Sequence, residues 1–257
     1  MDVPNYPKSV VVFAAHPDDT EIFCAGTLAL LRRVGYAVTI CTVTAGGMGG
    51  FGSDEASTIR RREAEARAAA EQLGAEYRCL GGRDGYLYDT EDMRIRAQDV
   101  IREARAGIVI GHLSVDYHPD HRAASAIADA AAILATLPNV PSRFPPLEAN
   151  PLFYHSATLG LTDPLGNQIA RPHFYVDIGS VEDVKMAMLA CHQSQIEVMR
   201  VMHKMDDFFG AMQAQDLAWG REAGVRFAEA YWQHRGGGFQ KTPLIQTELK
   251  DYVIEVS

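Results

Sequence analysis

Two short motifs, HPDD at residues 16–19 and HPDH at residues 118–121, each bring histidine and aspartate together. Imidazole and carboxylate groups at this density are typical ligands of Zn²⁺, which in enzymes binds three protein groups and keeps one position for water. Six side chains are more than three ligands require, so the surplus could act as acids and bases. The six are His16, Asp18, Asp19, His118, Asp120 and His121. A simpler interpretation, aspartates that only cap helices and histidines on the surface, suits one such motif better than two.

Both motifs stand where a predicted strand passes into a predicted helix. The apolar run at residues 9–15 ends directly before the first motif, and the run at 107–112 ends a short loop before the second. Further strand patterns cover 37–44 and 77–80, and helical patterns cover 18–34, 54–73, 94–105 and 120–137. This alternation predicts a Rossmann-like, doubly wound, mostly parallel α/β sheet with helices on both faces. Ligands in such folds gather at the carboxyl ends of the strands, so we expect the two motifs to meet there.

The pattern changes after residue 137. Five prolines punctuate residues 138–151, and strand patterns at 152–157 and 173–178 precede helical patterns at 181–205 and 216–232. The last third has too few strand patterns to form a domain alone. We therefore expect a single α/β domain over residues 1–257, with a core at about 9–137 and a C-terminal α/β elaboration at about 138–257.

The composition is that of an ordinary globular protein, with 47% hydrophobic and 22% charged residues. The formal net charge of −9 argues against nucleic acid or an anionic membrane as a partner, because both favour basic surfaces. Four widely spaced cysteines without a CxxC pair fit reduced thiols. There is no secretory signal pattern and no apolar run of ~20 residues. These features predict a cytoplasmic protein without membrane insertion.

The segments around both motifs resemble the PIG-L/LmbE-like family of zinc-dependent N-deacetylases. They read AHPDDTE at 15–21 and DYHPDHR at 116–122, with weaker likeness in TAGG at 44–47, RRRE at 60–63, LG at 73–74, DG at 84–85 and HQSQ at 192–195. The resemblance implies a zinc-dependent hydrolase that removes an acetyl group from a small N-acetylglucosamine-type sugar or conjugate. It also implies Zn²⁺ as the cofactor and a homo-oligomer.

By position, the resemblance places the zinc ligands on His16, Asp19 and His121, the general base on Asp18 and a transition-state histidine on His118. Spacing alone does not decide which of His118 and His121 binds the metal. The chemistry agrees with this division, since zinc lowers the pKa of a bound water to ~7 and a neighbouring carboxylate can collect its proton. A protonated histidine can then stabilise the oxyanion and supply a proton to the leaving amine.

The resemblance also implies residues that contact the substrate or support the ligands. A substrate-contacting arginine falls on Arg60 and a sugar-contacting aspartate on Asp84, although a solvated helix face and an ordinary turn are competing interpretations. Tyr117 could lend its hydroxyl to the intermediate. Glu21 and Asp120 are expected behind the ligands, with Glu21 bracing a ligand histidine.

A glycine loop at residues 47–52, GMGGFG, matches the GxGxxG pattern of dinucleotide-binding proteins. It follows the second predicted strand rather than the first, and Asp54 and Glu55 place negative charge where a pyrophosphate would sit. We therefore expect no nucleotide cofactor, and interpret the segment as a flexible loop at the rim of the active site. The other histidines carry no motif, except that His192, in the HQSQ stretch, could reach an active site.

Other functions remain open for the same residues. Some proteins that resemble this family are amidases of thiol conjugates, or hydratases that add water to unsaturated acids. A hydratase needs cations for its substrate's carboxylates, and the sequence offers Arg60, Arg61, Arg83 and Arg122. A module that only binds a ligand is a further alternative, but binding alone has no use for a carboxylate such as Asp18 beside the metal.

Overall fold

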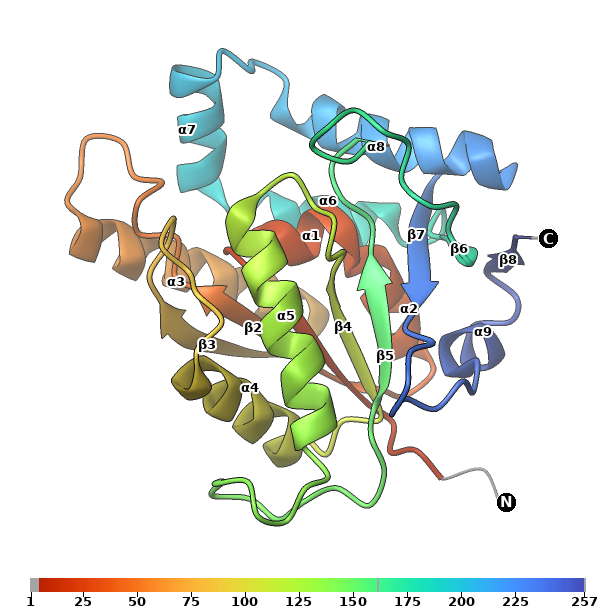
Figure 1. The fold of residues 1–257 in the computed structure, drawn as a ribbon. Coiled ribbons are helices and arrows are strands. Elements are labelled where there is room, and N and C mark those ends of the chain that lie inside the picture. The colour runs from red at the N-terminus through yellow and green to blue at the C-terminus, as the bar shows by residue number, and fades with distance from the viewer. Residues whose placement is uncertain (1–4, 161, 257) are drawn as a thin grey trace.

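The computed structural model describes residues 5–160 and 162–256, and within these ranges eight strands form one sheet (Figure 1). Its order is β3-β2-β1-β4-β5-β7-β6-β8. The strands are β1 (Ser9–Ala14), β2 (Ala37–Thr44), β3 (Glu76–Gly82), β4 (Ile108–His112), β5 (Leu152–Ser156), β6 (Phe174–Asp177), β7 (Ala228–Gln233) and β8 (Val253–Glu255). Strands β3, β2, β1, β4 and β5 pair in parallel, whereas β7, β6 and β8 join through antiparallel pairings. The mostly parallel α/β fold is thus confirmed.

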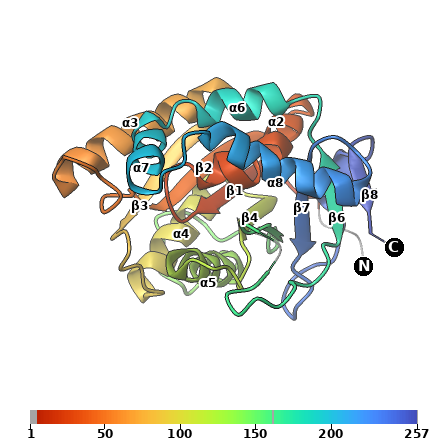
Figure 2. The same ribbon diagram turned by 90° about the horizontal axis from the view of Figure 1, so that it is seen from above.

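Helices cover both faces of the sheet. They are α1 (Asp19–Phe23), α2 (Ala25–Arg33), α3 (Glu55–Leu73), α4 (Glu91–Glu103), α5 (Pro119–Leu134), α6 (Glu182–Leu189), α7 (Gln193–Met202), α8 (Phe208–Ala223) and α9 (Leu244–Glu248). Figure 2 shows α4 and α5 on one face and α2, α3 and α6 on the other. Val10 and Val12 of β1 pack into one hydrophobic core, and Val11 and Phe13 pack into another. Burial on both faces explains why this strand is a continuous apolar run.

Three helices expected from the sequence have different bounds in the structure, and the last of them, α8, begins at Phe208. The pattern at 18–34 is divided at Cys24, which has a φ of −152°, and the pattern at 181–205 is divided between α6 and α7. The pattern at 216–232 is wrong in its second half. There α8 ends at Gly224, whose φ of +75° is one that glycine adopts readily, and the chain continues as β7. All six residues of β7 are buried, so its sequence does not show the clear alternation of apolar and polar residues that would indicate a strand.

The C-terminal third adds strands to the sheet that the first half begins. Residues 138–151 run without a helix or strand and lead into β5, which pairs with β4 in parallel. Strands β7, β6 and β8 extend the sheet from β5, and α8 packs on β7 and β6. In the part of the chain that the structure describes, none of the helices is both long and apolar enough to cross a membrane.

Candidate functional site

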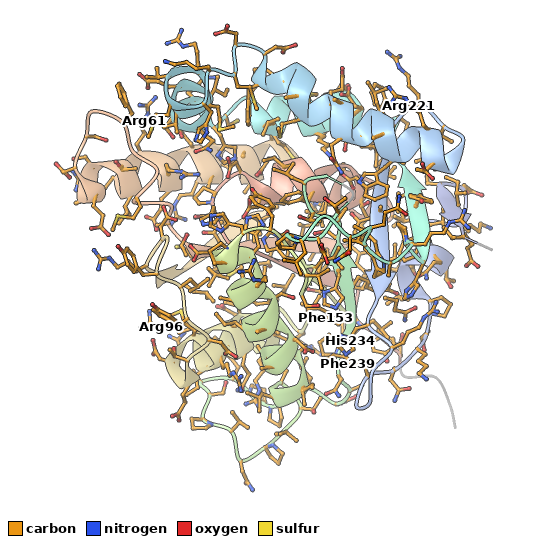
Figure 3. The ribbon with its side chains drawn as sticks, turned by 45° about the horizontal axis from the view of Figure 1, so that its top comes forward. Arg61, Arg96, Phe153, Arg221, His234 and Phe239 are labelled. Atoms are coloured by element: carbon orange, nitrogen blue, oxygen red, sulfur yellow. The ribbon has the colours of Figure 1, made fainter. Side chains whose placement is uncertain are left out.

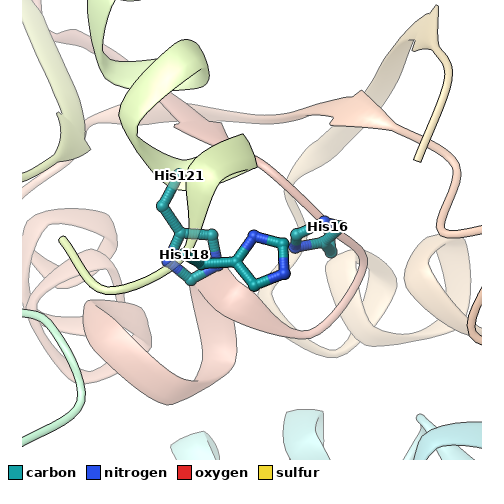
Figure 4. Close-up of side chains that lie close together, drawn as sticks. All are labelled: His16, His118 and His121. Atoms are coloured by element: carbon teal, nitrogen blue, oxygen red, sulfur yellow. The ribbon is translucent and has the colours of Figure 1, made fainter. Parts of the chain in front are cut away.

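The two histidine–aspartate motifs meet at the carboxyl edge of the sheet, as the sequence predicts. Strands β1 and β4 are parallel neighbours, so the loops that follow them emerge side by side. The ring of His16 lies 4.8 Å from that of His118 and 5.4 Å from that of His121, measured between centroids (Figure 4). Residues from distant parts of the chain are therefore within reach of one small ligand.

In two of these histidines, one ring nitrogen faces carboxylates. We call it the outer nitrogen, and we call the other ring nitrogen the inner one. His16 Nε2 lies 3.2 Å from Asp120 Oδ2 and 3.3 Å from Asp84 Oδ1, so Nε2 carries a hydrogen and Nδ1 is left for another partner. In the same way, His121 Nδ1 lies 3.0 Å from Asp116 Oδ1, which leaves Nε2 free. A histidine whose outer nitrogen donates to a carboxylate is the usual form of a metal-binding imidazole.

The inner nitrogens of both histidines face Asp19. Its Oδ2 lies 3.4 Å from His16 Nδ1, and its Oδ1 lies 3.4 Å from His121 Nε2. The backbone N–H of His16 also donates to Oδ2, which fixes the carboxylate between the two rings. Two imidazole nitrogens and a carboxylate, all buried or partly buried, form a donor set that fits a divalent metal ion such as Zn²⁺.

The charge of the cluster favours a bound cation. Burial lowers the pKa of His121, but the charge of Asp19 and the hydrogen bond to Asp116 outweigh it and raise that pKa to about 9. Burial raises the pKa of Asp19, yet the neighbouring histidines hold it well below its usual range. The site thus keeps its carboxylates ionised and stabilises positive charge on the histidines.

Among the described residues, three other groupings of donor atoms share members with this one, and one of them consists of His16 and the two carboxylates at its Nε2, Asp84 and Asp120. His16, His118 and His121 form a second, and Asp19, His112 and His121 form a third, each with ligand atoms within 4.8 Å of one another. In the third, His112 Nε2 accepts the backbone N–H of Ala15 at 2.9 Å, so its lone pair is occupied. His118 is part-exposed, and its Nδ1 accepts the backbone N–H of Asp120, which places the ring hydrogen on Nε2.

Asp18 is buried beside the cluster in an uncommon backbone conformation. It precedes α1 with a φ of +99°, a region that non-glycine residues occupy at a cost and that is often found at active sites. Burial raises the pKa of its carboxyl to about 6, although the nearby Arg62 charge opposes this shift. A carboxylate with a pKa near neutrality is suited to accept and return a proton.

Of the three consecutive arginines, Arg62 is the one that contacts Asp18. The Arg62 guanidinium is buried and donates from Nη1 to Gly46 O at 3.1 Å and from Nη2 to Pro17 O at 2.8 Å, with Asp18 Oδ1 3.5 Å away. Arg60 is exposed on the other side of α3, and its guanidinium donates to Ser57 Oγ one turn earlier. In a run of three arginines, the buried one is identified only by which of them faces the protein interior when the helix packs against the core.

Glu21 is buried, but its partner differs from the expected one. Its Oε2 lies 3.3 Å from Nε2 of His192, which precedes α7, and not beside one of the three proposed ligand histidines. The pairing arises because α1 packs against α6, and His192 lies in the short segment between α6 and α7. His192 is 1% exposed. In the sequence, the HQSQ stretch indicated that this residue could reach an active site.

The remaining predicted residues lie around the cluster. The Tyr117 ring is partly exposed and lies 5.6 Å from the His121 ring and 5.8 Å from the His118 ring. Asp120 contacts His16 as expected and also accepts the backbone N–H groups of Gly85 and Leu87. Asp84 is near His16, but its other oxygen accepts backbone N–H groups of the glycine loop.

A separate pair of histidines packs away from the metal cluster. His155 Nδ1 contacts His112 O at 2.8 Å, and its Nε2 lies 3.3 Å from His234 Nδ1. Figure 3 shows His234 beside Phe153 and Phe239, whose ring centroids lie 5.9 Å and 4.3 Å from its own. Burial lowers the pKa of His155 to about 4, so this imidazole is neutral in the folded protein.

Comparison with known proteins agrees with this geometry. Residues 11–132 match the family model described as PIG-L, GlcNAc-PI de-N-acetylase. The chain is 33% identical over 204 residues to diacetylchitobiose deacetylase from Thermococcus kodakarensis, covering 74% of this chain and 71% of that protein. It is 29% identical to 4-oxalmesaconate hydratase from Pseudomonas putida, covering 76% of each. The crystal structure of the conserved protein TT1542 from Thermus thermophilus matches with a TM-score of 0.73 at 30% identity, over 92% of this chain and 98% of that one. The chain therefore belongs to the PIG-L family.

Proposed function

We propose that this protein is a zinc-dependent N-deacetylase that hydrolyses the acetamide of a small N-acetylglucosamine-type sugar or conjugate. The observation that carries the proposal is that Asp18 is buried next to Asp19 of the His–Asp donor set, close enough for the charges of Asp19 and His16 to act on its carboxyl. Several relatives are named as deacetylases of N-acetylglucosamine derivatives, which supports the substrate class.

Three residues would hold the metal. His16 and His121 offer their inner nitrogens, and Asp19 offers its carboxylate, with one oxygen facing each imidazole. A bound Zn²⁺ supplies Lewis acidity toward a carbonyl oxygen and lowers the pKa of water. Asp116, Asp120 and Asp84 hold the two imidazoles in the required tautomers.

Asp18 and His118 would move the protons of the reaction. Asp18 takes a proton from the water whose oxygen attacks the acetyl carbon. His118, with a hydrogen on Nε2, donates to the oxygen that gains negative charge. When the C–N bond breaks, the proton that was taken from the water passes to the amine nitrogen, and the products are acetate and a free amino sugar.

A second candidate reaction is hydration of an unsaturated carboxylic acid, because one relative is named as a hydratase. That reaction requires cations for the substrate's carboxylates. The exposed Arg61 pairs with Glu65 and Glu197, and the guanidinium of Arg122 donates to the backbone carbonyls of residues 116 and 117. Arg60 donates to Ser57, and Arg83 lies over the Tyr86 ring. Since these guanidiniums already have partners in the protein, the structure favours the deacetylase.

One experiment separates the reactions. Purified protein, analysed for metal, is incubated with N-acetyl sugars, thiol-conjugate amides and unsaturated dicarboxylates, and the products are read by mass. Deacetylation removes ~42 Da and hydration adds ~18 Da. An Asp18→Asn variant, carrying metal but lacking the base, is the matched control. Full activity of metal-free protein would refute the proposal.

Location and assembly complete the proposal. All four cysteines are free thiols in the structure, which supports a reducing, cytoplasmic compartment. We also propose that the protein forms a homo-oligomer, as the family resemblance implies, and takes a small molecule rather than nucleic acid as its partner. Light scattering of the purified protein tests the oligomer.

A further inference from the structure

The glycine loop at residues 47–52 and the preceding Gly46 pack against α3 on one side. Gly46 O accepts a hydrogen bond from Arg62. A Cβ on Gly49 would lie 2.7 Å from Arg62 Nη1, and one on Gly50 would lie 2.1 Å from Thr58 Oγ1. The loop backbone therefore packs directly against the helix, and this close approach accounts for glycine at both positions.

A single carboxylate ties the outer side of the same loop. Asp84 Oδ2 accepts the backbone N–H of Met48 at 2.9 Å and that of Gly49 at 3.3 Å. Its other oxygen, Oδ1, lies 3.3 Å from Nε2 of His16. The Asp84 side chain is only 12% exposed, so both of its oxygens are engaged within the protein.

We propose that Asp84 is a positioning residue, which couples the glycine loop to the His16 imidazole. The inference rests on the proposed function, because His16 matters here as a metal ligand. One oxygen fixes the loop and the other lies against the ring, so a displacement of the loop would move the Asp84 carboxylate away from His16 Nε2.

The coupling links the rim of the site to its centre. Asp120 contacts the same Nε2 and is itself held by backbone N–H groups of residues 85 and 87, so the loop that carries Asp84 is fixed next to the ring. The glycine loop exposes Met48 and Phe51 at the rim. A substrate that contacts these side chains would therefore act on His16 through one carboxylate.

Two substitutions at this position have different expected effects. Asp84→Ala removes both contacts. Asp84→Asn keeps an oxygen that can accept the Met48 and Gly49 N–H groups, but loses the negative charge beside His16. Asp89→Ala is the matched control, because Asp89 lies in the same segment but pairs with Arg94.

The first measurement is amide hydrogen exchange, which needs no substrate. In Asp84→Ala, the amides of Met48 and Gly49 should exchange about 10-fold faster than in the wild type, while Asp84→Asn and Asp89→Ala should retain protection. The second is Zn²⁺ affinity by chelator competition, which should fall about 10- to 100-fold in both Asp84 variants and remain unchanged in Asp89→Ala.

Kinetics on the active sugar complete the test. A positioning role lowers kcat in both Asp84 variants, because the His16 imidazole is no longer held in place. A raised KM with unchanged kcat, loop exchange and zinc affinity would overturn the inference and show that Asp84 binds the sugar. If wild-type protein deacetylates no sugar, the proposed function fails, while the exchange and affinity results still decide the role of Asp84.

Discussion

Replacement of Arg62 by methionine is the sharpest test of how the site is built. Methionine is long and unbranched, so it fills much of the same space without supplying donors or charge. The substitution removes the hydrogen bonds to Gly46 O and Pro17 O and the ion pair with Asp18. Arg60→Met is the control, because it makes the same change two residues away on an exposed part of α3.

The expected loss of stability follows from these contacts. A buried carbonyl left without its donor costs about 1–3 kcal/mol, and breaking a buried ion pair costs about 3–5 kcal/mol. One guanidinium makes all of the contacts, so the costs overlap, and we expect Arg62→Met to lower the free energy of unfolding by about 3–5 kcal/mol. Arg60→Met should change it by less than about 0.5 kcal/mol.

Activity should separate the two variants as well. Arg62 holds the segments that carry Asp18 and the glycine loop, and a displacement of about 1 Å in a reacting group costs about 10²-fold in rate. Urea unfolding gives the free energies, and amine release measured well below the unfolding midpoint gives the rates. If Arg60→Met lost activity and Arg62→Met kept both activity and stability, the assignment of the buried arginine would be refuted.

Three further predictions concern the base, the metal and a buried histidine. Asp18→Asn should lower kcat by about 10²- to 10⁴-fold with metal content unchanged, and near-full activity would contradict the role of Asp18 as base. Chelation should abolish amine release and lower the Tm, and added Zn²⁺ should restore both; unchanged values would argue against a resident metal. The pKa of His155, about 4 in the folded protein against 6.5 for an ordinary histidine, means that the unfolded chain binds the proton first as pH falls. Stability should therefore decline by about 3 kcal/mol from pH 6.5 to pH 4, and urea unfolding of His155→Gln should show a shallower decline.

The fold and the centre of the site could be predicted because their signals are local. Apolar runs such as the one at residues 9–15 indicate strands buried on both faces, and parallel neighbours bring their following loops to one edge. Once β1 and β4 were expected in one parallel sheet, the meeting of the two motifs followed from topology. The C-terminal strand β7 lacked such a signal, since full burial removes the alternation of apolar and polar residues.

The supporting residues could not be predicted, because they depend on side-chain direction. Three consecutive arginines differ by about 100° of helical rotation at each step, and only the packing of α3 shows that Arg62 faces inward. The partner of Glu21 depends on the break between α6 and α7, which brings His192 against α1. Such pairs join residues far apart in the sequence. A family resemblance predicts them only when each residue is aligned with the correct position of the family's motif.

The two motifs also show why similar sequences take different roles at one site. In the first motif the helix begins at its fourth residue, Asp19, whereas in the second it begins at Pro119, the second residue. His118 therefore precedes its helix and accepts a backbone N–H, while Asp18 takes that place in the first motif, with a φ of +99°. The third residues diverge as a result: Asp18 Oδ1 lies 3.5 Å from Arg62 Nη2, whereas Asp120 Oδ2 lies 3.2 Å from His16 Nε2. A shift of two residues in where a helix starts is thus enough to give the two aspartates different partners.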